Sequence, residues 1–392
     1  MNSLTRLRYL TSGESHGPGL YAILEGMPAG LSLSEEYINI QLALRQQGYG
    51  RGGRMKIEKD EVHFKAGVRH GYTLGSPICM EMLNRDWKNW EKEMSIAPVN
   101  DPVKRVVSRP RPGHADLVGG LKYNFRDLRN VLERASARET TARVACGSVA
   151  RRLLEEVGVE IAGHVTHVGH IASQVRPKGV KDIRENTDMA KLRCLDKKAE
   201  QAMVALIDEA KKKGDSLGGI FEVYVEGLVP GLGSHVHWDR KLDGRLAQAM
   251  LSMQAVKGME IGDAYANAQS FGSQVHDPIF YDKKAKTFTR SSNRAGGLEG
   301  SMTNGMPLVV RGFLKPISTL YTPLHSVDIE TKEEFEASVE RSDTCAIAAA
   351  AVIAEAVVAL TLADAYLEKF GGDSMEELKR NLEGYRKQLA SY

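Results

Sequence analysis

"CAIAAAAVIAEAVVALTLA", residues 345–363, is a nearly continuous apolar run that decides how the fold must be built. The run consists mostly of alanine and carries Glu355 near its middle. A carboxylate is costly in the hydrocarbon of a bilayer, so a membrane span is disfavoured. We expect instead a helix buried within a protein core.

Outward from this run, the hydrophobic pattern is mixed. Helices are expected at 35–47, 127–157, 196–213, 239–256, 333–370 with a break near 342, and 374–390. Strands are expected at 20–24, 55–65, 158–174 and 219–229, with a strand-rich region at 277–316. Because no repeat or linker marks a boundary, we expect one domain over residues 1–392.

Composition restricts the class of protein. The chain has 392 residues, of which 42% are hydrophobic and 26% charged, which predicts a globular protein with a large core. The four cysteines share no close spacing and the N-terminus has no apolar run of signal-peptide length, so we expect a reducing, cytoplasmic location. A net charge of +3 and an aromatic content of 6% argue against a nucleic-acid partner.

A glycine-rich loop, "GESHGPG" at 13–19, lies between two short apolar runs. Its glycines let a ligand approach the backbone closely, while Ser15 and His16 supply a hydroxyl and a titratable ring. The loop is equally typical of a hairpin turn with a solvated histidine. The stretch alone leaves both interpretations open.

Arginines gather in four places. In "RQQGYGRGGR", residues 45–54, Arg45, Arg51 and Arg54 flank glycines that formally match G-x-G-x-x-G. A dinucleotide fingerprint follows a strand and opens a helix, whereas this loop follows an expected helix and precedes an expected strand. We therefore expect a flexible loop that closes over an anion, with a solvated surface loop as the alternative.

A second cluster, "SRPRPGHAD" at 108–116, presents Arg109, Arg111 and His114 on a backbone stiffened by prolines. In a third, "ERASARETT" at 133–141, Arg134 and Arg138 are four residues apart and would repel on one helical face unless an anion lay between them.

The fourth cluster, "RSDTCAIAAAA" at 341–351, places Arg341 before the apolar run. Ser342 or Asp343 is expected to cap the buried helix, whose positive dipole end would point outward. Four such clusters together indicate an enzyme that binds phosphates and carboxylates. The histidines of "HVTHVGH", residues 164–170, alternate faces on a strand, and His235 and His237 lack a third ligand, so we expect no metal site.

Three long motifs, in order, resemble those of the chorismate synthase family: "GESHGPGLYAILEGMP" at 13–28, "ERASARETTARVACGSV" at 133–149 and "RSDTCAIAAAAVIAEAV" at 341–357. The resemblance covers essentially the whole chain. Ala135, where many relatives have serine, and Met259, where a smaller residue is common, depart from the family pattern.

The resemblance implies a carbon–oxygen lyase of the shikimate pathway, which makes aromatic amino acids. Such an enzyme converts 5-enolpyruvylshikimate 3-phosphate to chorismate and phosphate by 1,4-elimination, using reduced FMN without net oxidation. A flavin-dependent oxidoreductase that uses the same FMN pocket for net hydride transfer is the alternative. Whether NADPH or a separate flavin reductase supplies the reducing equivalents stays open.

The resemblance also implies residue roles. His114 would protonate the departing phosphate, His16 would protonate the reduced flavin near N1 and O2, and Asp343 would relay a proton at flavin N5. Ser15 and Ser136 are further candidate catalytic residues. The implied flavin-binding residues are Arg134, Ala135, Ser136, Gln254, Ala255, Gly300, Lys315, Pro316, Ile317, Ser318, Thr319 and Arg341. The arginines implied to hold the substrate, or NADPH, are Arg45, Arg51, Arg54, Arg111 and Arg138, again with Arg341.

The fold that the resemblance implies is an α+β fold, a single large domain with long helices sandwiched between antiparallel β-sheet layers. It also implies a homotetramer that has no membrane or nucleic-acid partner.

Overall fold

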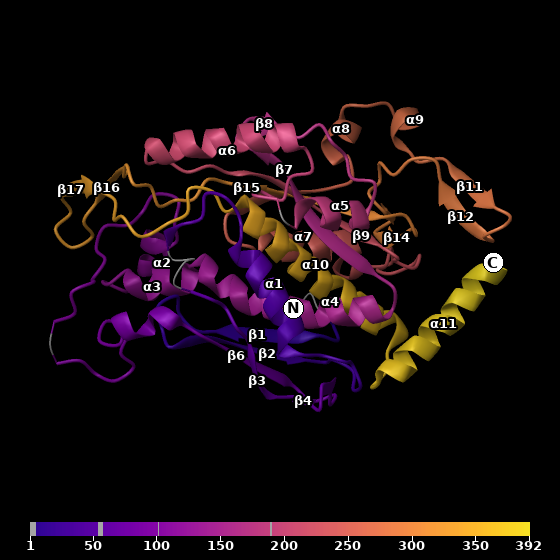
Figure 1. Ribbon diagram of the computed structural model, residues 1–392, viewed down its shortest axis with the longest axis horizontal. Helices are drawn as coiled ribbons and strands as arrows, with labels where there is room; N and C mark the ends of the chain where they lie inside the picture. Colours follow the sequence, from indigo (N-terminus) through magenta and orange to yellow (C-terminus); the bar gives the residue numbers. More distant parts are fainter. Residues whose placement is uncertain (1–4, 54–57, 101, 189) are drawn as a thin grey trace.

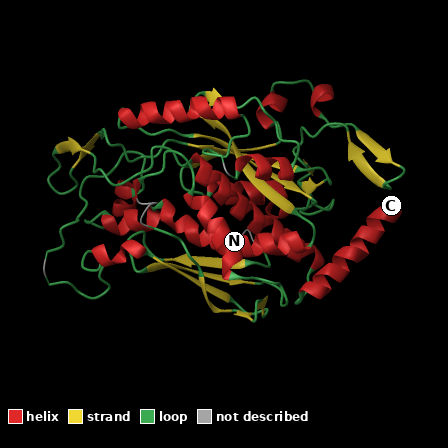
Figure 2. Cartoon of the chain, viewed as in Figure 1, coloured by secondary structure: helices red, strands yellow, loops and turns green. Residues whose placement is uncertain are grey.

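Two antiparallel sheets enclose a layer of helices in the computed structural model, which describes residues 5–53, 58–100, 102–188 and 190–392 (Figures 1 and 2). One cluster of buried hydrophobic side chains runs through both sheets and the helices between them. The expected α+β sandwich is therefore confirmed.

The first sheet has the strand order β1-β2-β6-β3, made of β1 (Arg8–Ser12), β2 (Gly19–Glu25), β6 (Ile78–Leu83) and β3 (His63–Ala66). Side chains alternate along β2, so that Leu20, Ala22 and Leu24 are buried while Tyr21 and Ile23 face outward. This period of two fixes which face of the sheet covers the helices.

The second sheet has the order β10-β15-β9-β7-β8, made of β10 (Val256–Ile261), β15 (Leu308–Leu314), β9 (Gly219–Glu226), β7 (Glu160–Val168) and β8 (Ile171–Ala172). All its pairings are antiparallel, with bulges in β7 and β10. Helix α6 (Lys197–Lys212) lies along the edge of the molecule beyond this sheet (Figure 1).

The helix layer contains α1 (Glu35–Gln46), α4 (Thr140–Glu156), α7 (Leu242–Leu251) and α10 (Ile347–Phe370). Helix α10 is long and apolar enough to cross a membrane, but its most apolar stretch is entirely buried, and the helix packs on α4, β7 and β9. Its Glu355 is neutralised by Arg151 at 2.6 Å and Arg193 at 3.2 Å. The prediction of a buried core helix is confirmed.

Shorter elements and the C-terminal helix α11 complete the fold. They are β4 (Val68–Arg69), β5 (Tyr72–Thr73), η2 (Arg85–Asn89), α2 (Asp116–Tyr123), α3 (Arg129–Ala135), η3 (Ala137–Glu139), α5 (Val180–Thr187), η4 (Trp238–Arg240), α8 (Ala264–Ala268), α9 (Gly272–Val275), β11 (Ile279–Asp282), β12 (Thr287–Arg290), β13 (Leu298–Glu299), β14 (Met302–Thr303), β16 (His325–Val327), β17 (Glu334–Glu336) and α11 (Met375–Ser391).

The helix expected at 333–370 is wrong before residue 347. Residues 334–336 form β17, which pairs with β16, and Phe335 packs under the guanidinium of Arg109 at 3.8 Å from the ring centre. The backbone N–H of Ser338 then donates to the carbonyl of Arg109. These tertiary contacts override the helical preference of the local sequence.

The single helix expected at 127–157 is also wrong, because Ser136 interrupts it in an extended conformation with φ −61° and ψ 143°. The Ser136 hydroxyl accepts a hydrogen bond from the backbone of Arg138 and so begins η3 instead. Residues 158–174 fold as β7, a turn and β8, and residues 239–256 form η4 and α7 and reach the start of β10. The strand expected at 55–65 falls partly outside the described residues, and β3 begins at His63.

Candidate functional site

Most of the predicted site residues that the structure describes lie on loops and helix ends at one end of the helix layer, where α4 and α10 both begin. Arg45, at the end of α1, donates to Thr140 at the start of α4 at 3.2 Å. Gly50 accepts a hydrogen bond from Thr344, just before α10. The positive ends of two helix dipoles therefore face these loops, which favours bound anions.

His16 is buried in the loop between β1 and β2. Its Nδ1 atom lies 2.9 and 3.0 Å from the two carboxylate oxygens of Glu133 in α3, and its ring stacks on Trp90 with centroids 3.8 Å apart. The alternative of a solvated histidine in a hairpin turn is thus wrong. Ser15 is buried beside it, and its hydroxyl lies 3.1 Å from that of Ser136.

His114 lies at the end of the proline-stiffened loop. Its Nδ1 atom is 2.6 Å from Oδ1 of Asp116. The guanidinium of Arg111 donates to both oxygens of the same carboxylate, at 2.8 Å to Oδ2 and 3.0 Å to Oδ1. Burial alone would raise the pKa of Asp116, but the hydrogen bonds from His114 and Arg111 hold it well below the usual range. This carboxylate is therefore ionised beside His114.

Asp343 does not cap α10, which corrects the expectation of a capping role. The helix begins after Ala346, whose side chain cannot cap, and Ser342 does not cap it either. Asp343 instead accepts a hydrogen bond from the backbone N–H of Gly52 at 2.6 Å and pairs with Arg51 at 2.9 Å. It thus ties the glycine-rich loop after α1 to the segment before α10.

Arg45 and Arg138 share one buried carboxylate, Asp60. Arg45 lies 2.7 Å from Oδ2, and Arg138 bonds Oδ1 and also donates to Asn84 at 2.8 and 3.0 Å. Burial alone would raise the pKa of Asp60, but the two guanidinium groups lower it to about 2.

Arg134 lies in α3 and donates to the backbone of Thr11 at 2.8 Å and of Gly13 at 3.1 Å. Because Ser136 breaks the helix, Arg134 and Arg138 do not share a helical face. The expected repulsion across one face is therefore wrong.

The predicted flavin-binding residues after β15 lie beside the loop that carries His114. Lys315 Nζ donates to the carbonyl of Gly113 at 3.1 Å and to Ser318 at 2.9 Å, and Thr319 accepts from Arg111 at 2.8 Å. Pro316 and Ile317 lie between them. Burial, and then Lys257, lower the pKa of Lys315.

Gln254 and Ala255 join the same group. Ala255, at φ +66°, accepts a hydrogen bond from the backbone of Lys315 at 2.9 Å, and Gln254 donates to Glu139 at 3.2 Å. Glu139 also accepts from Thr11, which Arg134 contacts, so these hydrogen bonds connect Gln254 to Arg134. Ala135 precedes Ser136 in this segment.

Gly300 lies apart from this group. It forms the turn between β13 and β14, next to Ser301, whose carbonyl accepts from the first residue of α7, Leu242. Gln254 follows the other end of α7, which has 10 residues and so spans about 15 Å. Arg54, another predicted residue, lies outside the described residues.

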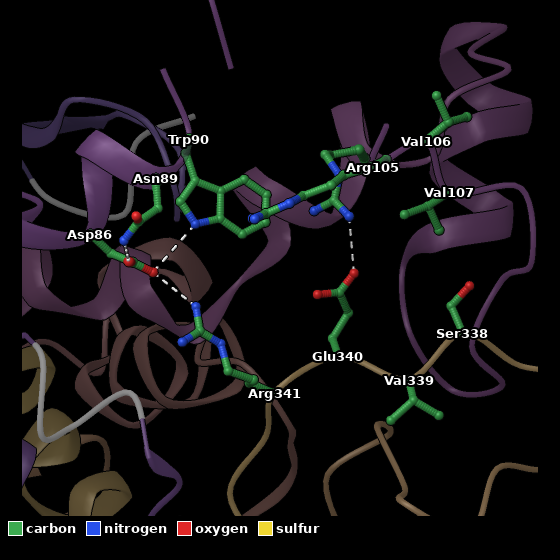
Figure 3. A pocket seen from close by; sticks show the side chains of 11 residues that line it. Asp86, Asn89, Trp90, Arg105, Val106, Val107, Ser338, Val339, Glu340 and Arg341 are labelled. Atoms are coloured by element: carbon green, nitrogen blue, oxygen red, sulfur yellow. Dashed lines mark hydrogen bonds and ion pairs between the residues drawn. The ribbon is translucent and has the colours of Figure 1, made fainter. Parts of the chain in front are cut away.

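Arg341 borders a cavity of about 750 Å³ next to the Trp90 ring (Figure 3). Its guanidinium donates to Asp86 at 2.8 Å, and Asp86 also accepts from the indole N–H of Trp90 at 3.3 Å. The guanidinium of Arg105 lies over the same indole, 3.9 Å from its centroid.

The carboxylates that hold these cations are not among the residues predicted from the sequence. Asp60, Asp86, Asp116 and Glu133 each contact a predicted histidine or arginine. Asp116 and Glu133 were detectable, because one is two residues from His114 and the other opens the "ERASARETT" motif. Asp60 and Asp86 carry no comparable local signal.

Known proteins are similar to this chain over nearly its full length. The family model described as chorismate synthase matches residues 7–367. The chorismate synthase of Geobacillus sp. (strain WCH70) is 58% identical over 384 residues, covering 97% of this chain and 99% of the relative. That of Bacillus subtilis (strain 168) is 55% identical over 386 residues, with the same coverage. A crystal structure of chorismate synthase matches with a TM-score of 0.81 and 44% identity, covering 99% of this chain and 100% of that one.

Proposed function

This chain belongs to the chorismate synthase family of shikimate-pathway enzymes, and on that premise we propose that it converts 5-enolpyruvylshikimate 3-phosphate to chorismate and phosphate by 1,4-elimination with reduced FMN. One observation carries the proposal: His16 and His114, each held by a buried carboxylate, lie among arginines at the end of the helix layer where α4 and α10 begin. Arginine suits planar, two-pronged contacts to the phosphate and carboxylates of such a substrate.

The residues present fit a flavin. Gln254 Oε1 is buried without a hydrogen-bond partner among the described residues, so a donor on a ligand would satisfy it. Lys315, Ser318 and Arg134 supply donors for a phosphate. We propose that FMN is held by the flavin-binding residues already named, including Gly300 beyond the other end of α7. When bound, reduced FMN supplies an electron-rich ring that stabilises charge developing on the substrate.

The chain's own residues would handle the protons and the anions. His114 donates a proton to the departing phosphate, with Asp116 contacting its Nδ1 atom and so orienting the ring. His16 holds a proton beside the ligand. Asp343 accepts a proton, with Arg51 and the Gly52 N–H orienting its carboxylate.

The remaining arginines would bind the substrate. The arginines proposed to hold the anionic groups of the substrate, or those of NADPH, are Arg45, Arg51, Arg54, Arg111, Arg138 and Arg341. Carboxylates neutralise Arg45, Arg111 and Arg138, and each carboxylate would have to share its arginine with an incoming anion.

We further propose a cytoplasmic homotetramer, with reduced FMN supplied either by NADPH at this site or by a separate flavin reductase. The outer face of the first sheet supports association, because Leu10, Ile23 and Leu83 are 70%, 45% and 52% exposed on neighbouring strands.

The stoichiometry of the flavin tests the proposed function. Reduced FMN and an excess of 5-enolpyruvylshikimate 3-phosphate are mixed with the protein without oxygen, and chorismate, phosphate and flavin absorbance are followed. An elimination releases many equivalents of both products per flavin while the flavin stays reduced. Oxidation of one flavin per product would contradict the proposal and indicate the oxidoreductase instead.

A further inference from the structure

The ring of His16 is fixed at one edge and one face. Both oxygens of Glu133 lie within 3.0 Å of its Nδ1 atom, and the backbone N–H of His16 donates to Oε2 of the same carboxylate at 2.9 Å. The indole of Trp90 stacks on the ring at an angle of 22°. The imidazole therefore has a defined plane as well as a defined edge.

Glu133 faces hydrogen-bond donors. Arg129 donates to its Oε1 atom at 2.9 Å, and the side chain is 1% exposed. Burial alone would raise the pKa of Glu133, but the hydrogen bonds from His16 and Arg129 keep it below its ordinary value. An ionised carboxylate only accepts hydrogen bonds, so the Nδ1 atom that it contacts must carry a proton.

We propose that Glu133 is a positioning residue that fixes His16 in the tautomer with Nδ1 protonated, with Trp90 holding the plane of the ring. Nε2 is then the atom that exchanges a proton with a ligand. The tautomer follows from the contacts alone, whereas its effect on turnover rests on the proposed function.

Glu133→Gln changes the tautomer by a specific route. A glutamine oxygen can accept from only some of the donors that surround this position, so its NH₂ group would face an N–H of His16 or Arg129. That conflict is relieved when the NH₂ group donates to a bare Nδ1, which requires the proton to move to Nε2. We therefore expect neutral His16 to switch tautomer in this variant.

The experiment uses the ligand-free protein with ¹⁵N-labelled histidine rings, studied by NMR above the pH at which the rings titrate. The His16 signals are assigned by their loss in His16→Asn. Wild type should show protonated Nδ1, and Glu133→Gln should show protonated Nε2. Glu222→Gln is the matched control, because Glu222 contacts His164 at 3.1 Å in another buried pair and should leave the His16 signals unchanged.

Turnover separates this inference from the proposed function. Glu133→Gln should lower kcat by about 10²-fold, the scale of one proton-transfer group, with the KM for substrate within about threefold of wild type.

An unchanged His16 tautomer in Glu133→Gln would overturn the inference. Neutral wild-type His16 protonated on Nε2 would also overturn it, and this measurement remains decisive if the variant does not fold. A switched tautomer with undiminished turnover would support the role of Glu133 and contradict proton transfer by His16.

Discussion

Asp343 accepts a hydrogen bond from the backbone of Gly52 at 2.6 Å, across 291 positions of sequence. Gly52 has room for this contact only because it lacks a side chain, since a Cβ atom there would lie 2.7 Å from the carbonyl oxygen of Ser342. The loop that carries Arg51 is thereby held against the start of the buried helix.

Asp343→Asn should lower turnover by tenfold or more, with a much smaller effect on the thermal midpoint. The amide can still accept from Gly52, but it cannot take up a proton and no longer neutralises Arg51. A tenfold loss corresponds to about 1.4 kcal/mol of barrier. The measurements are turnover with reduced FMN supplied and a thermal melt, with Ser342→Ala as the neighbouring control. Turnover within about twofold of wild type would contradict a role for this carboxylate in proton transfer.

The layers could be predicted from sequence wherever local periodicity and burial agree. The run at 345–363 is nearly all apolar, and from Ile347 onward it is buried on all sides. Phe335 shows the limit, because its place in a strand depends on Arg109, more than two hundred positions away, which no local window contains.

For the site, motifs identified the histidines and arginines. They did not identify Asp60, whose importance arises only when α1 and η3 bring Arg45 and Arg138 to the same carboxylate. The partners of a buried charge are set by tertiary structure and not by its sequence neighbours.

His114→Ala should lower kcat by roughly 10²- to 10⁴-fold and leave the affinity for FMN nearly unchanged, because the ring is proposed to act on the leaving phosphate. Stopped-flow turnover and fluorescence titration of FMN measure the two quantities. His167→Ala is a suitable control, since His167 contacts Thr166 on β7 of the second sheet. Full activity in His114→Ala would exclude it as the acid.

Asp60 should make stability depend on pH in the acid range. Its pKa is lowered from 3.8 to about 2 in the folded chain, so its contribution is present above pH 3.8 and is lost as the pH falls toward 2. The shift corresponds to about 2 kcal/mol. Denaturant unfolding should therefore show that the difference in unfolding free energy between wild type and Asp60→Asn becomes smaller as the pH falls over this interval. Asp373→Asn, at an exposed position, should show no such difference at any pH; a difference for Asp60→Asn that stays constant with pH would contradict the assignment.

Gly147 sets how closely α4 approaches α10. A Cβ atom there would lie 2.4 Å from Cβ and 2.6 Å from Cα of Ala356, so Gly147→Ala must push two buried helices apart. We expect a loss of about 1–3 kcal/mol of unfolding free energy, measured by denaturant unfolding.

Gly244→Ala, in α7, is the matched control: a Cβ atom there meets nothing within 4 Å, so the same change should stabilise the chain by up to about 1 kcal/mol through helix propensity. Ala356→Gly combined with Gly147→Ala should recover only part of the loss, because the clash also involves the backbone of residue 356. Equal changes in unfolding free energy for Gly147→Ala and Gly244→Ala would contradict the claim that Gly147 sets the distance between α4 and α10.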